Sequence, residues 1–289
     1  MISILIQQLV GGLAIGSMYA LVSLGIALIW AAMKVVNWAQ GEFVMVGAYI
    51  GLTVYVYWHL PFILALIVSA LIIFVLAALI EKFAVTPVRK YGDLSLLMIT
   101  IGVAILVKQL AIIIWSPIGE VFPSVFGNKP IVIGDIYIVP EKIVIFFIGL
   151  GFMVILYLFL FRTKVGKGMR AVSQSRDTAA IMGVNVTTIE ILAFGIAGAL
   201  GALGGVLLAP LMYVEPAMGT YVGIKGFVGA VLGGFGSLPG AALGGLLLGI
   251  IESIAAAFLP SGFKEAVAFL ILIVILLVKP SGLFSKKSN

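Results

Sequence analysis

The first 33 residues of this chain contain no Asp, Glu, Lys, Arg or His. Within them, residues 4–31 form an apolar run longer than the roughly 20 residues that cross a bilayer as a helix. A signal peptide would carry a basic region before a shorter apolar core, and this segment has neither feature. We therefore predict that residues 4–31 form a retained transmembrane helix, because lipid leaves backbone polar groups no partner outside the segment.

Similar apolar segments recur along the sequence, which is 63% hydrophobic and only 10% charged, against about 25% charged residues in soluble domains. The fold class predicted is all-α: a single polytopic membrane domain over residues 1–289 with about 8–9 transmembrane helices. The shorter, glycine-rich stretch 222–236 is either a ninth span or a re-entrant one. The other expected spans are 4–31, 42–58, 61–80, 94–115, 143–161, 189–213, 238–258 and 265–279.

Lysine and arginine are concentrated in loops, which predicts the orientation of the chain. Placing 81–93, 162–188 and 280–289 in the cytoplasm, together with Lys34 and Lys279, leaves twelve of the 17 basic residues inside and three outside, with Lys108 and Lys225 within apolar segments. The N-terminus is then outside and the C-terminus cytoplasmic, which requires an odd number of crossings and favours counting 222–236. The outer loop 116–142 is rich in proline and glycine. It is expected to be a short ordered cap or hairpin, or else a solvated connector.

The sequence offers little material for catalysis. It has no cysteine and a single histidine, His59, which excludes disulfides, a cysteine nucleophile and a multi-histidine metal cluster. No GxxxxGK[ST] phosphate-binding loop occurs. We predict a non-enzymatic protein without metal or cofactor, in which active transport would draw energy from a partner or an ion gradient. The net charge of +6 is explained by membrane topology rather than by nucleic-acid binding.

Glycine makes up 35 of the 289 residues, and many glycines stand four positions apart. Such pairs let two helix backbones approach closely in lipid. We interpret them as packing sites within this chain, with contact to a second subunit or flexible helices along a path as alternatives. The pairs are Gly12/Gly16, Gly47/Gly51, Gly201/Gly205, Gly229/Gly233, Gly240/Gly244 and Gly245/Gly249.

A few polar residues interrupt the apolar segments, and each is costly in lipid unless it has a function. Residues 37–42 form a polar break between the first two spans, and such breaks are tolerated where they line a cavity. The alternative is a cytoplasmic turn with Glu42 near a helix N-terminus. Lys108 and Glu252 are better explained by ion pairing or snorkelling. The candidate path or gate residues are Asn37, Gln40, Glu42 and Lys225.

A basic island covers residues 162–185, and inside it residues 177–183 resemble a short helix that ends at a glycine. In a membrane protein, such a cytoplasmic segment gives another protein a surface to hold, although ordinary topogenic charge is an alternative. We take the loop of about 162–188 as a candidate coupling loop for an external motor. The residues expected to carry it are Arg170, Asp177, Ala179, Ala180 and Gly183.

Three segments carry a resemblance to a known family. Residues 36–43 (VNWAQGEF) resemble the N-F-A-H-G-E segment of LivH-type permeases of branched-chain amino acid ABC transporters, with Trp38 and Gln40 as departures. The most specific match is the run 223–241, which is similar to the family's K-A-F-x-A-A-V-L-G-G-x-G-S-x-P-G-A. Residues 277–284 resemble its L-x-x-P-x-G-L-F close. Asp177 to Gly183 keep the spacing of the family's E-A-A-x-x-x-G element, which faces the ATPase.

This resemblance implies the permease subunit of an ATP-driven, binding-protein-dependent importer in the plasma (inner) membrane of a prokaryote. The implied substrate is a branched-chain or other apolar amino acid. The implied partners are a second, related permease, two cytoplasmic ATPases, an extracytoplasmic binding protein and membrane lipid, with no nucleic acid. A binding protein would supply selectivity, so no carboxylate or amine clamp is expected in the path. Alternatives are a urea or amide importer permease, an ion-coupled secondary carrier and a scaffold without transport.

Overall fold

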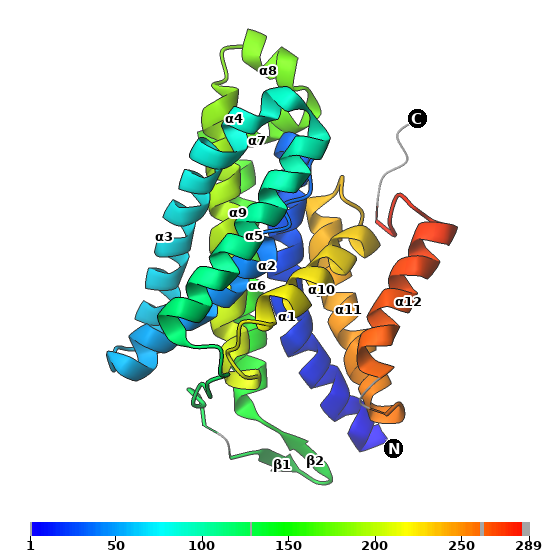
Figure 1. The fold of residues 1–289 in the computed structure, drawn as a ribbon. Helices are drawn as coiled ribbons and strands as arrows, with labels where there is room; N and C mark the ends of the chain where they lie inside the picture. Colours follow the sequence, from blue (N-terminus) through cyan, green and yellow to red (C-terminus); the bar gives the residue numbers. More distant parts are fainter. Residues whose placement is uncertain (1, 128, 261–262, 285–289) are drawn as a thin grey trace.

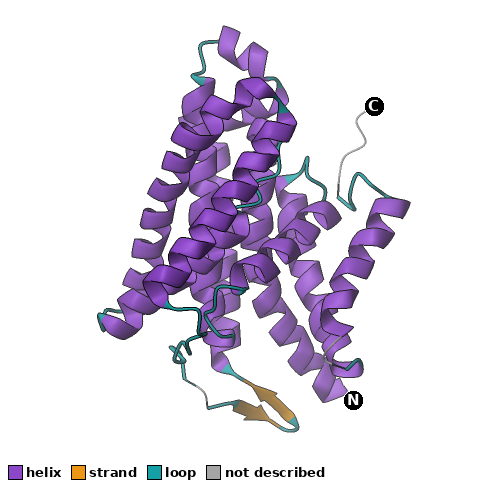
Figure 2. Cartoon of the chain, in the orientation of Figure 1, coloured by secondary structure: helices purple, strands orange, loops and turns teal. Residues whose placement is uncertain are grey.

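The computed structural model describes residues 2–127, 129–260 and 263–284. Long helices run side by side between two ends of the molecule, with a small β-hairpin at one end and the short helices α7 and α8 at the other (Figure 1). Helix and loop make up nearly all of the rest (Figure 2). The elements are α1 (Ile2–Met33), α2 (Gln40–Leu52), η1 (Thr53–Tyr57), α3 (Phe62–Ile80), η2 (Glu81–Val85), α4 (Thr86–Val88), η3 (Arg89–Tyr91), α5 (Asp93–Trp115), β1 (Ile131–Ile133), β2 (Ile136–Ile138), α6 (Pro140–Arg162), α7 (Lys164–Gln174), α8 (Arg176–Ile181), α9 (Val186–Leu208), η4 (Ala209–Leu211), α10 (Met218–Gly233), α11 (Leu238–Phe258) and α12 (Phe263–Val278).

The predicted all-α membrane fold is confirmed, and a helix covers most of every predicted span. Within the described part of the chain, six helices are long and apolar enough to cross a membrane, while α10 and the apolar part of α12 are shorter. The number of crossings and the outside location of the N-terminus stay predictions. Residues 285–289 of the predicted cytoplasmic tail lie outside the described residues.

One predicted loop is wrong. Residues 81–93 form π-, α- and 3-10-helical turns that continue α3 as far as Tyr91. Pro87 stands in the first turn of α4, where a missing backbone N–H is tolerated. The helical run ends at Gly92, whose φ of +95° lies in the region that favours glycine.

Helix α1 is the centre of the fold and packs against α6, α9, α10 and α11. The glycine pairs explain how close this packing is. A Cβ added at Gly12 would meet the Cα of Ile250 at 2.8 Å, and one at Gly229 would meet the Cα of Gly245 at 2.9 Å. Packing within the chain, as predicted for these glycines, is therefore confirmed at both contacts.

The loop predicted to lie outside contains a hairpin, as expected. Strands β1 and β2 pair antiparallel, with Ile131 opposite Ile138, and Gly134 turns the chain with a φ of +59°. Near the start of α1, Gln7 donates a hydrogen bond to the Asp135 carbonyl oxygen at 3.3 Å. The N-terminal end of α1 therefore lies at the hairpin end of the molecule, opposite α8 (Figure 1).

Candidate functional site

The polar break between α1 and α2 is a turn whose residues line one side of a cavity. Helix α1 stops where Lys34 takes a φ of +60°, a left-handed conformation that is uncommon outside glycine. The Asn37 side chain accepts a hydrogen bond from the Ala39 amide at 3.0 Å, and α2 then begins at Gln40. Glu42 falls in the first turn of α2. The segment therefore lines a cavity and also places an acid in the first turn of a helix; its role as a path or gate stays a prediction.

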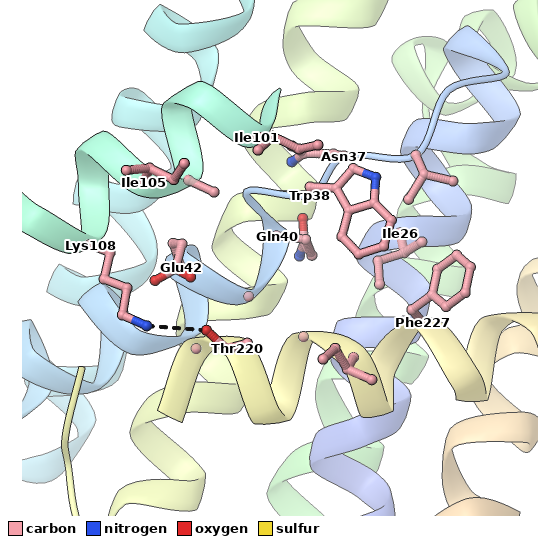
Figure 3. A pocket seen from close by; sticks show the side chains of 16 residues that line it. Ile26, Asn37, Trp38, Gln40, Glu42, Ile101, Ile105, Lys108, Thr220 and Phe227 are labelled. Carbon is pink, nitrogen blue, oxygen red and sulfur yellow. Dashed lines mark hydrogen bonds between the residues drawn. The ribbon is translucent and has the colours of Figure 1, made fainter. Parts of the chain in front are cut away.

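A cavity of about 270 Å³ opens beside this turn, between α2, α5, α10 and the C-terminal half of α1 (Figure 3). The predicted residues Asn37, Gln40 and Glu42 all line it and are all buried, with Glu42 only 6% exposed. Gln40 is fixed because its Nε2 donates to the Ala197 carbonyl oxygen in α9 at 2.7 Å. Three of the four predicted path residues are therefore gathered at one cavity.

Each of these three side chains has a polar atom without a partner. Among the described residues, no hydrogen bond reaches Asn37 Nδ2, Gln40 Oε1 or Glu42 Oε2. A buried polar group left unpaired costs about 1–3 kcal/mol. Three such atoms at one cavity wall mark a place where the fold leaves hydrogen-bonding capacity open.

Lys108 of α5 enters the same cavity from the facing wall (Figure 3). Its Nζ donates a long hydrogen bond of 3.4 Å to Thr220 Oγ1 in α10. No carboxylate oxygen of the described residues lies within 4 Å of it. The ion pair expected for Lys108 is therefore not seen.

Close approach between α2 and α10 depends on glycine. A Cβ added at Gly223 would lie 2.8 Å from the Cα of Gly41, and one at Gly219 would lie 2.9 Å from Glu42 Oε2. The Glu42 carboxylate thus rests against the backbone of α10, one residue from Thr220. This contact places the acid and the Lys108–Thr220 pair in one region of the cavity.

Lys225 does not join this cavity. Its Nζ lies 2.5 Å from Glu252 Oε1 in α11, and Tyr19 OH of α1 donates to Glu252 Oε2 at 2.9 Å. The ion pair predicted for Glu252 is confirmed. Sequence reasoning assigned Lys225 to the path, whereas the structure pairs it with the buried carboxylate of Glu252.

The segment predicted to be cytoplasmic contains the expected short helix. Ser175 caps α8 by accepting from the Thr178 amide at 3.3 Å, and Gly183 closes the turn after the helix with a φ of +81°. Asp177 and Ala180 are exposed, whereas Ala179 is buried. Ala179 therefore seats α8 against the protein rather than facing outward.

Two exposed apolar side chains at the end of α8 were missed. Ile181 is 85% exposed and Met182 is 78% exposed, at the end of the molecule opposite the hairpin (Figure 1). Their signal in the sequence is an Ile-Met pair directly before Gly183 in the basic island. The sequence alone does not show which side of a six-residue helix faces outward.

Arg170, which was expected to carry the coupling loop, lies in α7 and contacts the end of α6. Its guanidinium lies over the Phe161 ring, 4.5 Å from the centroid, which is a favourable cation–π geometry. The residue is half-buried at the junction of α6 and α7. It holds α7 against α6 and is not part of the exposed face of α8.

A chain of four charged residues at this end was also missed. Arg176, the first residue of α8, pairs with Glu190 of α9 with Nε and Oε1 3.3 Å apart. Arg89 contacts both Glu190 and Glu81, the latter at 3.0 Å. Both carboxylates are almost completely buried. The signal was present as acids at the ends of predicted spans, where topology rules treat them as ordinary flanking residues.

The family described as "Branched-chain amino acid transport system / permease component" matches residues 8–278. The chain belongs to this family. The matched region contains the cavity, the charged chain and α8, and so covers both of the candidate sites described above.

Curated relatives of the family cover nearly the whole chain. The high-affinity branched-chain amino acid transport system permease protein BraD of Pseudomonas aeruginosa is 34% identical, over 97% of this chain and 96% of that protein. The corresponding protein LivH of Escherichia coli strain K12 is 32% identical with the same coverage. In fold, the chain is similar to a solved structure, PsaBC from Streptococcus pneumoniae in complex with Fab, with a TM-score of 0.51 and 15% identity over 95% of this chain and 91% of that one.

Proposed function

We propose that this chain is the permease subunit of an ATP-driven, binding-protein-dependent importer of branched-chain or other apolar amino acids in the cytoplasmic membrane of a prokaryote. The observation that carries the proposal is the family match over residues 8–278. The names of BraD and LivH, which are more than 30% identical over almost their entire length, support the substrate class. The apolar helices support the location in a membrane.

The partners follow from what an importer of this kind needs. The sequence has no phosphate-binding loop of the GxxxxGK[ST] type, so cytoplasmic ATPases would provide the energy. We propose two such subunits, a second related permease and an extracytoplasmic binding protein.

The exposed end of α8 is the contact we assign to an ATPase. Ile181 and Met182 give it an apolar centre, and Asp177 and Ala180 lie beside them on exposed positions. Apolar residues surrounded by polar ones are typical of protein interfaces. Gly183 ends the helix, Ala179 seats it, and Arg170 holds the preceding helix in place.

Movement of α8 has a physical route into the helix bundle. Arg176 ties the first residue of α8 to Glu190, and Arg89 links Glu190 to Glu81 at the end of α3. We propose that a pull on α8 is passed to α9 and α3 through these ion pairs. Asn37, Gln40 and Glu42 then line the path or its gate, while Lys225 fastens α10 to α11.

The test is reconstitution. Vesicles holding this chain, its partner permease and the ATPases are expected to hydrolyse ATP faster, and to accumulate leucine, when ligand-loaded binding protein is added. If vesicles with this chain alone accumulate leucine when an ion gradient is applied, the chain is a secondary carrier instead. Uptake that is competed by urea but not by leucine would assign the chain to urea import.

A further inference from the structure

We propose that the cavity between α2, α5 and α10 is a binding site for a single zwitterionic α-amino acid with an apolar side chain. Glu42 would receive its ammonium group, and Lys108 with Thr220 would receive its carboxylate. This inference rests on the proposed function and differs from the sequence-based expectation that the path needs no clamp. Nothing in the family assignment requires such a site, because a binding protein can select the substrate before it reaches the membrane.

Neither charged residue of the cavity has an ion-pair partner among the described residues. Glu42 and Lys108 carry opposite charges and line the same cavity, yet no ion pair within 4 Å joins them. The carboxylate keeps one buried oxygen without a partner, and the lysine has only its 3.4 Å bond to Thr220 among the described residues. Charges in a membrane domain normally pair with each other. A ligand with one positive and one negative group satisfies both.

The chain provides an internal comparison. Lys225 and Glu252 are also a lysine and a glutamate on neighbouring helices, but their charged atoms meet at 2.5 Å and Tyr19 completes the contact. They therefore need no ligand. Glu42 and Lys108 line one cavity without forming an ion pair, which is the arrangement expected of a binding site.

The rest of the lining is apolar. Figure 3 shows the charged groups towards one end of the cavity and Trp38, Ile26 and Phe227 towards the other. Trp38 and Phe227 stack with centroids 5.9 Å apart, and Ile101 and Ile105 of α5 form the opposite wall. An aliphatic side chain would be buried against these residues, whereas a charged one would lose its hydration without a partner.

The size and the remaining polar atoms fit the same ligand. The volume of about 270 Å³ lies at the lower edge of the roughly 300–1,000 Å³ of ligand pockets, so the cavity suits one amino acid rather than a peptide. Asn37 Nδ2 and Gln40 Oε1 add an unpaired donor and an unpaired acceptor. A carboxylate and an ammonium group are the natural partners of these two atoms.

The test measures equilibrium binding to the assembled transporter without its binding protein, so that only the membrane site is read. The probes are leucine, leucine amide, which lacks the carboxylate, and 4-methylpentanoate, which lacks the ammonium group. Losing either group is expected to weaken binding by about 10- to 100-fold, as is typical for a hydrogen bond to a charged group.

The variants identify which residue meets which group. Glu42→Gln is expected to weaken the binding of leucine and of leucine amide by a similar factor but to leave the binding of 4-methylpentanoate unchanged. Lys108→Gln is expected to weaken the binding of leucine and of 4-methylpentanoate but not that of leucine amide. Lys90→Gln, which removes an exposed lysine of η3, is the matched control and should change none of the three.

Two results would overturn the inference. One is an equal loss of affinity for all three probes in both variants, although the complexes still elute intact. Such a loss would indicate damage to the fold rather than lost contacts. The other is no leucine binding by a complex that still takes up leucine when supplied with its binding protein. The second result would leave the proposed function standing, whereas a complex that does not transport leucine at all would reject the function itself.

Discussion

Glu190, near the start of α9, is the acid to which Arg176 ties the first turn of α8, and the same carboxylate is held from the other side by Arg89. Glu190 is 1% exposed, whereas the Arg176 side chain is 49% exposed. One end of this contact is thus fixed in the membrane domain, and the other lies on the segment that we assign to the ATPase.

This asymmetry predicts different effects for the two partners. Arg176→Gln should change the free energy of unfolding by less than about 1 kcal/mol, because exposed ion pairs contribute little. Ligand-stimulated ATPase activity should nevertheless fall, since α8 loses its tie to α9. Glu190→Gln should lower stability by about 3–5 kcal/mol, the usual result of removing one partner from a buried pair. Thermal unfolding and ATPase assays on the same preparations check both; a large stability loss in Arg176→Gln would contradict the argument.

The exposed pair on α8 gives a second prediction. Ile181→Ser combined with Met182→Ser should abolish co-purification of the ATPase subunits while leaving the helices inserted and folded, because both side chains are exposed. Thr187→Ala, an exposed position in the first turn of α9, is the control and should keep the ATPases bound. Full retention of the ATPases by the double variant would remove α8 from the interface.

Ala179 calls for a separate experiment because it is buried. Ala179→Leu should displace α8 and reduce ATPase binding together with stability, an overpacking effect of about 1–3 kcal/mol. Ala180→Leu, at the exposed neighbouring position, should reduce binding without that stability loss. Equal stability losses in the two variants, measured by thermal unfolding, would show that burial at 179 is not what distinguishes them.

How much could be predicted from the sequence depends on the range of the interaction. Apolar segment length is a local property, so the spans and the polar break at 37–42 were predictable. Which charges meet is not local: Lys225 and Glu252 are 27 residues apart in the chain, and Tyr19 and Glu252 are 233 apart. The sequence showed four isolated charges. Only the packing of α10 against α11 and α1 shows that Lys225 is paired whereas Lys108 is not.

A similar limit applies to short segments. Residues 81–91 carry basic residues, which indicated a loop. They are nevertheless helical, and Glu81 is buried there beside Arg89. On α8 the presence of a helix was predicted from its terminal glycine. The inward position of Ala179 was not, because one and a half turns give no periodic pattern to read.

Glycine contacts along α1 give a fourth prediction. A Cβ at Gly16 would lie 2.7 Å from the Leu246 carbonyl oxygen of α11, so Gly16→Leu should separate α1 from α11 and prevent a stable fold. Gly102 and Gly151 lie in α5 and α6, and among the described residues no heavy atom beyond the adjacent helix backbone comes within 4 Å of such a Cβ. Gly102→Ala and Gly151→Ala should be neutral or stabilise by up to about 1 kcal/mol, because alanine favours helix. Yields of monodisperse protein and thermal unfolding test this; a well-folded Gly16→Leu would contradict the packing role.

The Lys225–Glu252 pair predicts a non-additive stability effect. Lys225→Met leaves the carboxylate of Glu252 buried beside Tyr19 without its cation, and this should cost about 3–5 kcal/mol. Replacing both residues, as Lys225→Met with Glu252→Leu, removes the uncompensated charge and should recover most of that loss. Because neither residue lines the cavity, the double variant should still bind leucine with affinity close to the original. Unfolding measurements on the single and double variants give the coupling energy directly. If the double variant were as unstable as the sum of the two single variants, the pair would not be interacting. If it were stable but unable to bind leucine, Lys225 would belong to the path after all.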